Sequence, residues 1–121
     1  MRISEVSKIF DISSDTLRYY EKIGLIGPIK KEENIRNYNE DDLNRINFVK
    51  CMRSANLPIE VLIKYMKLFE EGDETIKERR DLLVAQQGEL AKNIADLQAA
   101  YDRLSYKIDL YDKQLLEKNL K

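Results

Sequence analysis

The sequence contains no histidine and no tryptophan, and it has one cysteine among 121 residues. Without histidine the chain lacks the commonest general base and the commonest metal ligand, and a single cysteine cannot form an intrachain disulfide. No apolar run approaches the ~20 residues that a membrane-spanning helix needs. These absences argue against an ordinary hydrolase or a zinc site, and we expect no enzyme activity, no cofactor and no metal.

Charged residues make up 36% of the chain and hydrophobic residues 43%, with only four glycines and two prolines. This composition favours helices over disorder or a β-sandwich. The 21 Lys and Arg nearly balance the 22 Asp and Glu, so that the net charge is −1 and charge alone does not indicate a nucleic-acid partner. The N-terminus reaches Glu5 without an apolar signal core, so we expect a cytoplasmic protein.

Residues 1 to about 26 are predicted to form two short helices. Ser4 is a candidate N-cap of the first helix, and Ser13 or Ser14 of the second. Gly24 follows the second helix, where a left-handed residue commonly ends a helix. Two short helices, a tight polar turn and a glycine stop are typical of a helix-turn-helix.

Residues 29–38 have turn residues in the middle and β-tolerant residues at both ends, which predicts a short hairpin, or wing. Asn39 is a candidate cap of a third helix, because three acidic residues follow it in the first turn. Pro58 suits the first turn of a fourth helix, which Gly72 closes.

The remainder of the chain carries apolar residues every seven positions in two offset series, an a/d heptad seam. Its members are Ile76, Leu83, Leu90, Leu97, Leu104 and Tyr111 in one series and Ile94, Tyr101, Ile108 and Leu115 in the other. A helix of about 40 residues would be about 60 Å long. The rest of the chain is too small to cover an apolar seam that runs along so long a helix. We therefore expect a homodimer and a mainly all-α fold, with a winged helix-turn-helix head (1–72) and a dimerisation coiled-coil helix (73–121).

A helical wheel places Arg18, Tyr19 and Lys22 on one face of the second predicted helix, opposite Leu17. Arg18 and Lys22 can neutralise phosphates, and Tyr19 can donate to a phosphate or touch a base edge. The plainer interpretation is that these are solvated charges, since acidic residues in the same region leave no basic excess. The architecture, a helix pair with a wing and a dimerising helix, makes the stronger case for DNA.

Three segments, ISEVS (3–7), TLRYYEKIGLI (16–26) and RNYNEDDL (36–43), together resemble the MerR family of bacterial transcription regulators. The resemblance covers residues 3 to about 70. Within the family, FVKCMR (48–53) and FEEGD (69–73) resemble the AdhR/NmlR branch, whose members respond to aldehydes and other electrophiles.

This resemblance implies a dimer joined by an antiparallel coiled coil, whose two winged heads bind a palindromic spacer in double-stranded promoter DNA. It implies that the protein distorts this spacer so that RNA polymerase can engage both promoter elements. By position it assigns as DNA contacts Thr16, Arg18, Tyr19 and Tyr20 in the second helix and Arg36 and Tyr38 in the wing. For Tyr20, packing inside the head is an equal alternative.

Cys51 lies on the third predicted helix. From the residues alone it reads as a small buried side chain, because Lys50 and Arg53 point to other faces and free cysteine is commonly buried. The branch resemblance instead implies an effector-sensing thiol that reacts covalently with an electrophile. The alternatives are a MerR-type repressor with an inert cysteine and a different or no small-molecule signal, and a coiled-coil adaptor whose head contacts only proteins.

Overall fold

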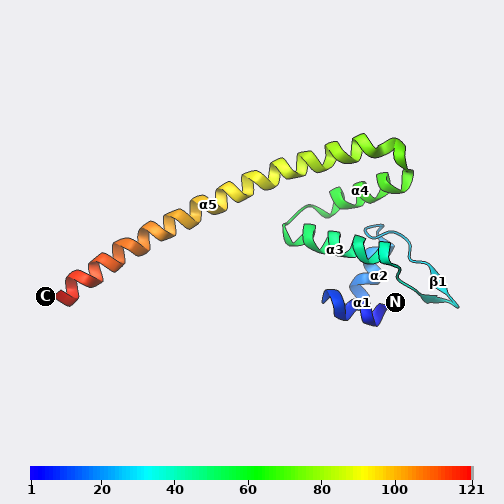
Figure 1. Cartoon of the computed structure of the whole chain (residues 1–121), viewed down its shortest axis with the longest axis horizontal. Coiled ribbons are helices and arrows are strands. Elements are labelled where there is room, and N and C mark those ends of the chain that lie inside the picture. Colours follow the sequence, from blue (N-terminus) through cyan, green and yellow to red (C-terminus); the bar gives the residue numbers. More distant parts are fainter. Residues whose placement is uncertain (121) are drawn as a thin grey trace. The chain divides into compact units, whose positions relative to one another are not determined.

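The computed structural model describes residues 1–120 (Figure 1). Its elements are α1 (Ile3–Phe10), α2 (Ser14–Lys22), β1 (Lys31–Glu32), β2 (Ile35–Arg36), α3 (Glu40–Ser54), α4 (Ile59–Glu71), the short 3-10 helix η1 (Asp73–Thr75) and α5 (Ile76–Leu120). This order confirms the prediction of a mainly helical chain with a small hairpin. Its contacts define two compact units, Met1–Leu83 and the chain from Val84 onward. The division between residues 72 and 73 stays a prediction about domains.

The first two helices begin and end through local hydrogen bonds. Helix α1 begins at Ile3, so the prediction that Ser4 caps it is wrong. The reason is Glu5, whose side chain accepts a hydrogen bond from the Arg2 N–H at 3.3 Å and fixes the helix start ahead of Ser4. Ser13 caps α2 as predicted, since its hydroxyl accepts from the Thr16 N–H at 3.1 Å.

The wing is a two-stranded antiparallel hairpin in which Lys31 pairs with Arg36 and Glu32 with Ile35. Its turn residues, Glu33 and Asn34, have φ values of 51° and 65°. Two consecutive left-handed residues characterise the type I′ turn that matches the twist of paired strands. The predicted wing is therefore confirmed.

A single apolar core holds α1–α4 and the base of the wing together. Its members are Val6, Leu17, Leu25, Ile26, Ile29, Tyr38, Ile46, Val49, Leu57 and Leu62. Helix α3 starts at a reciprocal capping box: the Asn39 side chain accepts from the Asp42 N–H at 2.8 Å, and the Asp42 carboxylate accepts from the Asn39 N–H at 2.8 Å. The caps and the core together fix α2 and the wing on one small scaffold.

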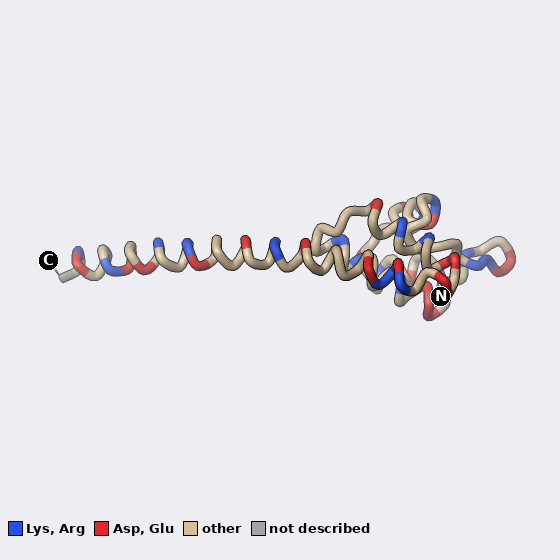
Figure 2. The backbone as a smooth tube through the Cα atoms, turned by 90° about the horizontal axis from the view of Figure 1, so that it is seen from above, with Lys and Arg blue, Asp and Glu red and all other residues tan. Residues whose placement is uncertain are grey.

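Helix α5 runs without a break for 45 residues, about 68 Å at 1.5 Å per residue. Along its C-terminal part the seam side chains are exposed: Leu97 to 71%, Tyr101 to 67% and Leu104 to 63%. Acidic and basic residues are interspersed along this helix (Figure 2). Among the described residues, none of the helices combines the length and the apolar character that crossing a membrane requires.

Candidate nucleic-acid interface

Helix α2 has one buried and one exposed face. Leu17 is completely buried, and it packs in the core that α1 shares. Arg18, Tyr19 and Lys22 are exposed, with Tyr19 exposed to 54%. The structure thus places the three side chains together on the free face of the helix, where a groove of DNA can reach them.

The exposed face is ordered by short-range polar contacts. The Ser13 hydroxyl donates to Thr16 Oγ1 at 2.7 Å, and Arg18 Nη1 donates to Asp15 Oδ1 at 3.0 Å. The Asp15 side chain is 96% exposed, and the Arg18 side chain 47%. An ion pair this exposed contributes little to stability, so Arg18 can exchange Asp15 for a phosphate at small cost.

The wing contributes Arg36, which the structure joins to α2. Arg36 Nε donates to Glu21 Oε1 at 2.7 Å, and both side chains are largely covered. This hydrogen bond raises the pKa of Arg36 above its ordinary value. The backbone N–H of Ile29, at the other side of the wing, donates to Glu21 Oε2 at 3.3 Å. Sequence reasoning missed Glu21, because nothing in a sequence marks an ion pair between residues so far apart.

Two of the predicted contact residues lie in or against the core. Tyr38 is only 2% exposed, so the prediction that it contacts DNA does not hold for this conformation. Tyr38 directly precedes the cap Asn39, where an apolar residue commonly packs against the fourth residue of the helix, here Leu43. Tyr38 belongs to the core cluster, and Leu43 is partly buried against it. Tyr20 is partly buried against the same cluster, which favours its packing alternative.

The Tyr38 hydroxyl is buried without a hydrogen-bond partner among the described residues. A buried polar group without a partner costs roughly 1–3 kcal/mol, so Tyr38→Phe should raise the free energy of unfolding by about 1 kcal/mol.

Burial also raises the pKa of Tyr38 above 10.0. As the pH rises past about 10, the unfolded chain therefore loses the phenol proton first, and the wild type loses stability there. Chemical denaturation at pH 7 and pH 10.5 checks both effects, because the variant lacks this part of the alkaline loss.

Charge is mixed over the whole head. Figure 2 shows acidic and basic residues interspersed along the helices and in the wing. The net charge of the chain is −1, so net charge alone does not attract it to DNA. Any attraction to phosphates must come from individually placed cations such as Arg18 and Arg36.

Cys51 lies on α3 and is exposed, so the reading of a buried side chain is wrong for the single chain. Its charged neighbours are engaged elsewhere: Lys50 donates to the carbonyl of Phe10, and Arg53 donates to the carbonyl of Leu57 at 2.7 Å. Within residues 1–120, no group of three or more Cys, Asp or Glu side chains could hold a metal ion.

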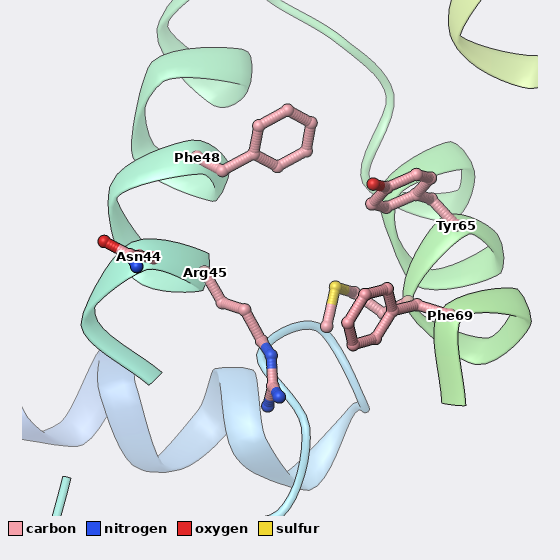
Figure 3. Close-up of a pocket in the computed structure, with 6 residues that line it drawn as sticks. Asn44, Arg45, Phe48, Tyr65 and Phe69 are labelled. Atoms are coloured by element: carbon pink, nitrogen blue, oxygen red, sulfur yellow. The ribbon is translucent and has the colours of Figure 1, made fainter. Parts of the chain in front are cut away.

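An apolar pocket of about 170 Å³ lies between α3 and α4, and the sequence did not single it out. Phe48 from α3 faces Tyr65 from α4, with ring centroids 5.6 Å apart (Figure 3). Arg45 places its guanidinium 5.5 Å from the Phe69 centroid. Phe48, which lines the pocket, lies on the same helix as Cys51 and one helical turn before it.

Comparison with known proteins gives consistent matches. Residues 1–68 match the MerR_1 family, described as MerR HTH family regulatory proteins. Over 84 residues the chain is 51% identical to the HTH-type transcriptional regulator AdhR of Bacillus subtilis (strain 168). This alignment covers 69% of the chain, and it spans only 60% of the length of AdhR.

Two solved structures are similar over most of their length. A crystal structure assigned to the MerR family of transcriptional regulators, from Listeria monocytogenes, superposes with a TM-score of 0.94 at 45% identity. The match covers 98% of this chain and 91% of the Listeria chain. HiNmlR, described as a MerR family regulator lacking the sensor domain and bound to promoter DNA, has a TM-score of 0.83 at 27% identity. That match covers 93% of this chain and 90% of the other.

Proposed function

The chain belongs to the MerR family of helix-turn-helix regulatory proteins, and from this premise we propose that it binds a palindromic promoter spacer as a homodimer. Its relatives are DNA-binding transcriptional regulators and not enzymes, and the resemblance to AdhR is confirmed. In the proposal, the bound dimer distorts the spacer and thereby controls how RNA polymerase engages the promoter.

The observation that carries this proposal is the exposed face of α2 beside the anchored wing. Arg18, Tyr19 and Lys22 are exposed on α2, and Thr16 lies in its first turn. Arg36 adds a cation from the wing. A helix face and a wing on one rigid scaffold can contact a groove and the neighbouring phosphates together. Support comes also from HiNmlR, which is described as bound to promoter DNA.

The homodimer is proposed from the seam of α5. Most of its side chains are more than half exposed in the single chain. An exposed apolar surface of this size typically marks an interface with another protein. A second copy of the same helix supplies the matching stripe. The proposed seam consists of Leu83, Leu90, Ile94, Leu97, Tyr101, Leu104, Ile108, Tyr111 and Leu115.

Distortion of the spacer is proposed on energetic grounds. Two heads joined by one coiled coil bind two half-sites at a fixed separation. Bending and untwisting a site of 20–30 base pairs costs of order 1–6 kcal/mol, which contacts made only on the distorted DNA can offset. A signal that favours one dimer geometry over another then shifts the population of distorted promoter.

Arg18→Ala tests DNA recognition. Because the variant loses one charge-assisted contact, its affinity for the operator should fall about 10–100-fold. The slope of log affinity against log salt should also fall by about 1, since one fewer phosphate is neutralised. Mobility-shift titrations at several salt concentrations measure both quantities.

The matched control is Arg103→Ala, which removes an exposed arginine from α5 outside the seam. It should bind DNA as the wild type does. Unchanged binding by Arg18→Ala would instead support the adaptor function, in which the head contacts only proteins.

The proposed signal is an aldehyde or a related electrophile that reacts with Cys51. The exposed thiol and the similarity to AdhR support this proposal. The cysteine sulfur adds to the carbonyl carbon and the carbonyl oxygen takes up the thiol proton, so a hemithioacetal forms without an oxidant. The alternative is a regulator of the same fold with an inert Cys51 and a different or no small-molecule signal. That alternative is favoured by the engagement of Lys50 and Arg53 with backbone carbonyls, since a reactive thiol needs nearby positive charge.

A further inference from the structure

One carboxylate joins the recognition helix to both sides of the wing. Glu21 lies in the last turn of α2, and its side chain is 18% exposed. Its Oε1 accepts from Arg36 Nε at 2.7 Å, at the end of β2. Its Oε2 accepts from the Ile29 N–H at 3.3 Å, ahead of β1. Both oxygens of Glu21 thus bind the base of the hairpin, one on each side.

The wing needs such an anchor because its own pairing is short. Each strand has two residues, and an isolated two-stranded hairpin is at best marginally stable in water. Burial of Ile29 and Tyr38 fixes the backbone at the base. It does not fix the long side chain of Arg36, which would otherwise lose rotamer freedom when it binds a phosphate.

We propose that Glu21 is a positioning residue for DNA binding, which acts by holding the Arg36 guanidinium ready for a backbone phosphate. An arginine has five N–H donors, and Glu21 engages the one on Nε. The donors on the two Nη atoms therefore suffice for a bidentate contact with a phosphate. This inference rests on the proposed function, because it presupposes that the wing meets DNA.

The sign of the effect separates this role from ordinary electrostatics. Glu21 carries a negative charge, and simple repulsion from phosphates predicts that its removal strengthens DNA binding. Positioning predicts the opposite, since Arg36 without its partner is mobile and the wing contact is lost. Weaker binding after removal of a negative charge is therefore the diagnostic result.

The test is a double-mutant cycle of Glu21→Ala and Arg36→Ala in the full chain, with operator affinity measured over a range of salt concentrations. Glu21→Ala should weaken binding about 5–20-fold and lower the salt slope by about 1, because one phosphate contact disappears. The double variant should bind no more weakly than Arg36→Ala, since Glu21 acts through Arg36. Glu32→Ala, which removes an exposed carboxylate from the wing itself, should bind equally or more tightly.

Tighter or unchanged binding by Glu21→Ala overturns the proposal, and so do additive losses in the double variant. A lower melting temperature with an unchanged salt slope also overturns it, because that pattern marks a purely structural role. If the alanine variant does not fold, Glu21→Met, which keeps the length of the side chain and removes both carboxylate acceptors, takes its place in the same cycle. If the wild type itself shows no salt-sensitive binding to a palindromic spacer, the proposed function fails instead, and the cycle distinguishes the two failures.

Discussion

Replacing Leu97 and Leu104 together by aspartate should convert the protein to a monomer that no longer binds its operator. The two residues lie one heptad apart in the proposed seam and are 71% and 63% exposed in the single chain. In a dimer the four introduced carboxylates would be buried in an apolar interface, where an unpaired charge costs several kcal/mol. The dimer should therefore be strongly destabilised. Sedimentation velocity at micromolar concentration should therefore show half the mass of the wild type.

Loss of DNA binding follows from the loss of the second head. In a dimer, binding of one head raises the effective concentration of the other at its half-site, which increases the overall affinity by about 10²–10⁴-fold. A monomer keeps only the affinity of one head. The mobility shift on a palindromic spacer should therefore disappear at concentrations that saturate the wild type.

The matched control places two aspartates on the opposite side of the same helix. Ala99 and Tyr106 are also seven residues apart, and both lie outside the seam. The Ala99→Asp, Tyr106→Asp variant should remain dimeric and bind DNA, although it adds the same charge to α5. A dimer that survives the Leu97 and Leu104 replacements would contradict the proposed seam and require another interface.

The fold was predictable from sequence wherever the determining interactions are local. Ser13, Asn39 and Gly24 mark helix ends through contacts within a few residues, and the structure confirms all three. The start of α1 was missed because Ser4 and Glu5 are both good helix-start residues. The Glu5 carboxylate, rather than the Ser4 hydroxyl, makes the bond that fixes that start.

Interactions between distant residues explain what was missed in the candidate site. Tyr38 was read from its motif as a DNA contact, whereas its position before a capped helix places the ring in the core. The Glu21–Arg36 pair joins two elements 15 residues apart in sequence. The α3–α4 pocket depends on Phe48 and Tyr65 meeting across two helices. The periodicity of a helix or strand predicts which residues share one face of that element. It does not predict which charged or aromatic side chains of different elements come into contact.

The exposure of Cys51 changes the argument about sensing. From the residues alone, Cys51 was expected to be a small buried side chain, because free cysteine is commonly buried. In the structure Phe48 lines the pocket and is partly buried, whereas Cys51 is exposed. An electrophile can therefore reach the thiol without unfolding α3. The positive charge that would favour the thiolate must then come from outside the local sequence, and a second copy of the chain is one source.

Replacing Cys51 by serine should abolish induction of a reporter by formaldehyde or methylglyoxal while leaving DNA binding intact. Serine has nearly the same shape as cysteine, but its hydroxyl is a far weaker nucleophile at neutral pH. Because Cys51 lies on α3, outside the exposed face of α2, operator affinity without an inducer should stay within about twofold of the wild type. Cys51 is the only cysteine in the chain, so the change removes all thiol chemistry.

Two controls make this result decisive. Cys51→Ala should behave like the serine variant, which excludes an effect of the new hydroxyl group. Native mass spectrometry at a low aldehyde concentration should show one adduct more per chain in the wild type than in either variant, because only the thiol is missing from the variants. If the serine variant is induced as strongly as the wild type, Cys51 is not the switch. The regulator would then need a signal recognised elsewhere, and the α3–α4 pocket beside Phe48 would be the first place to search for it.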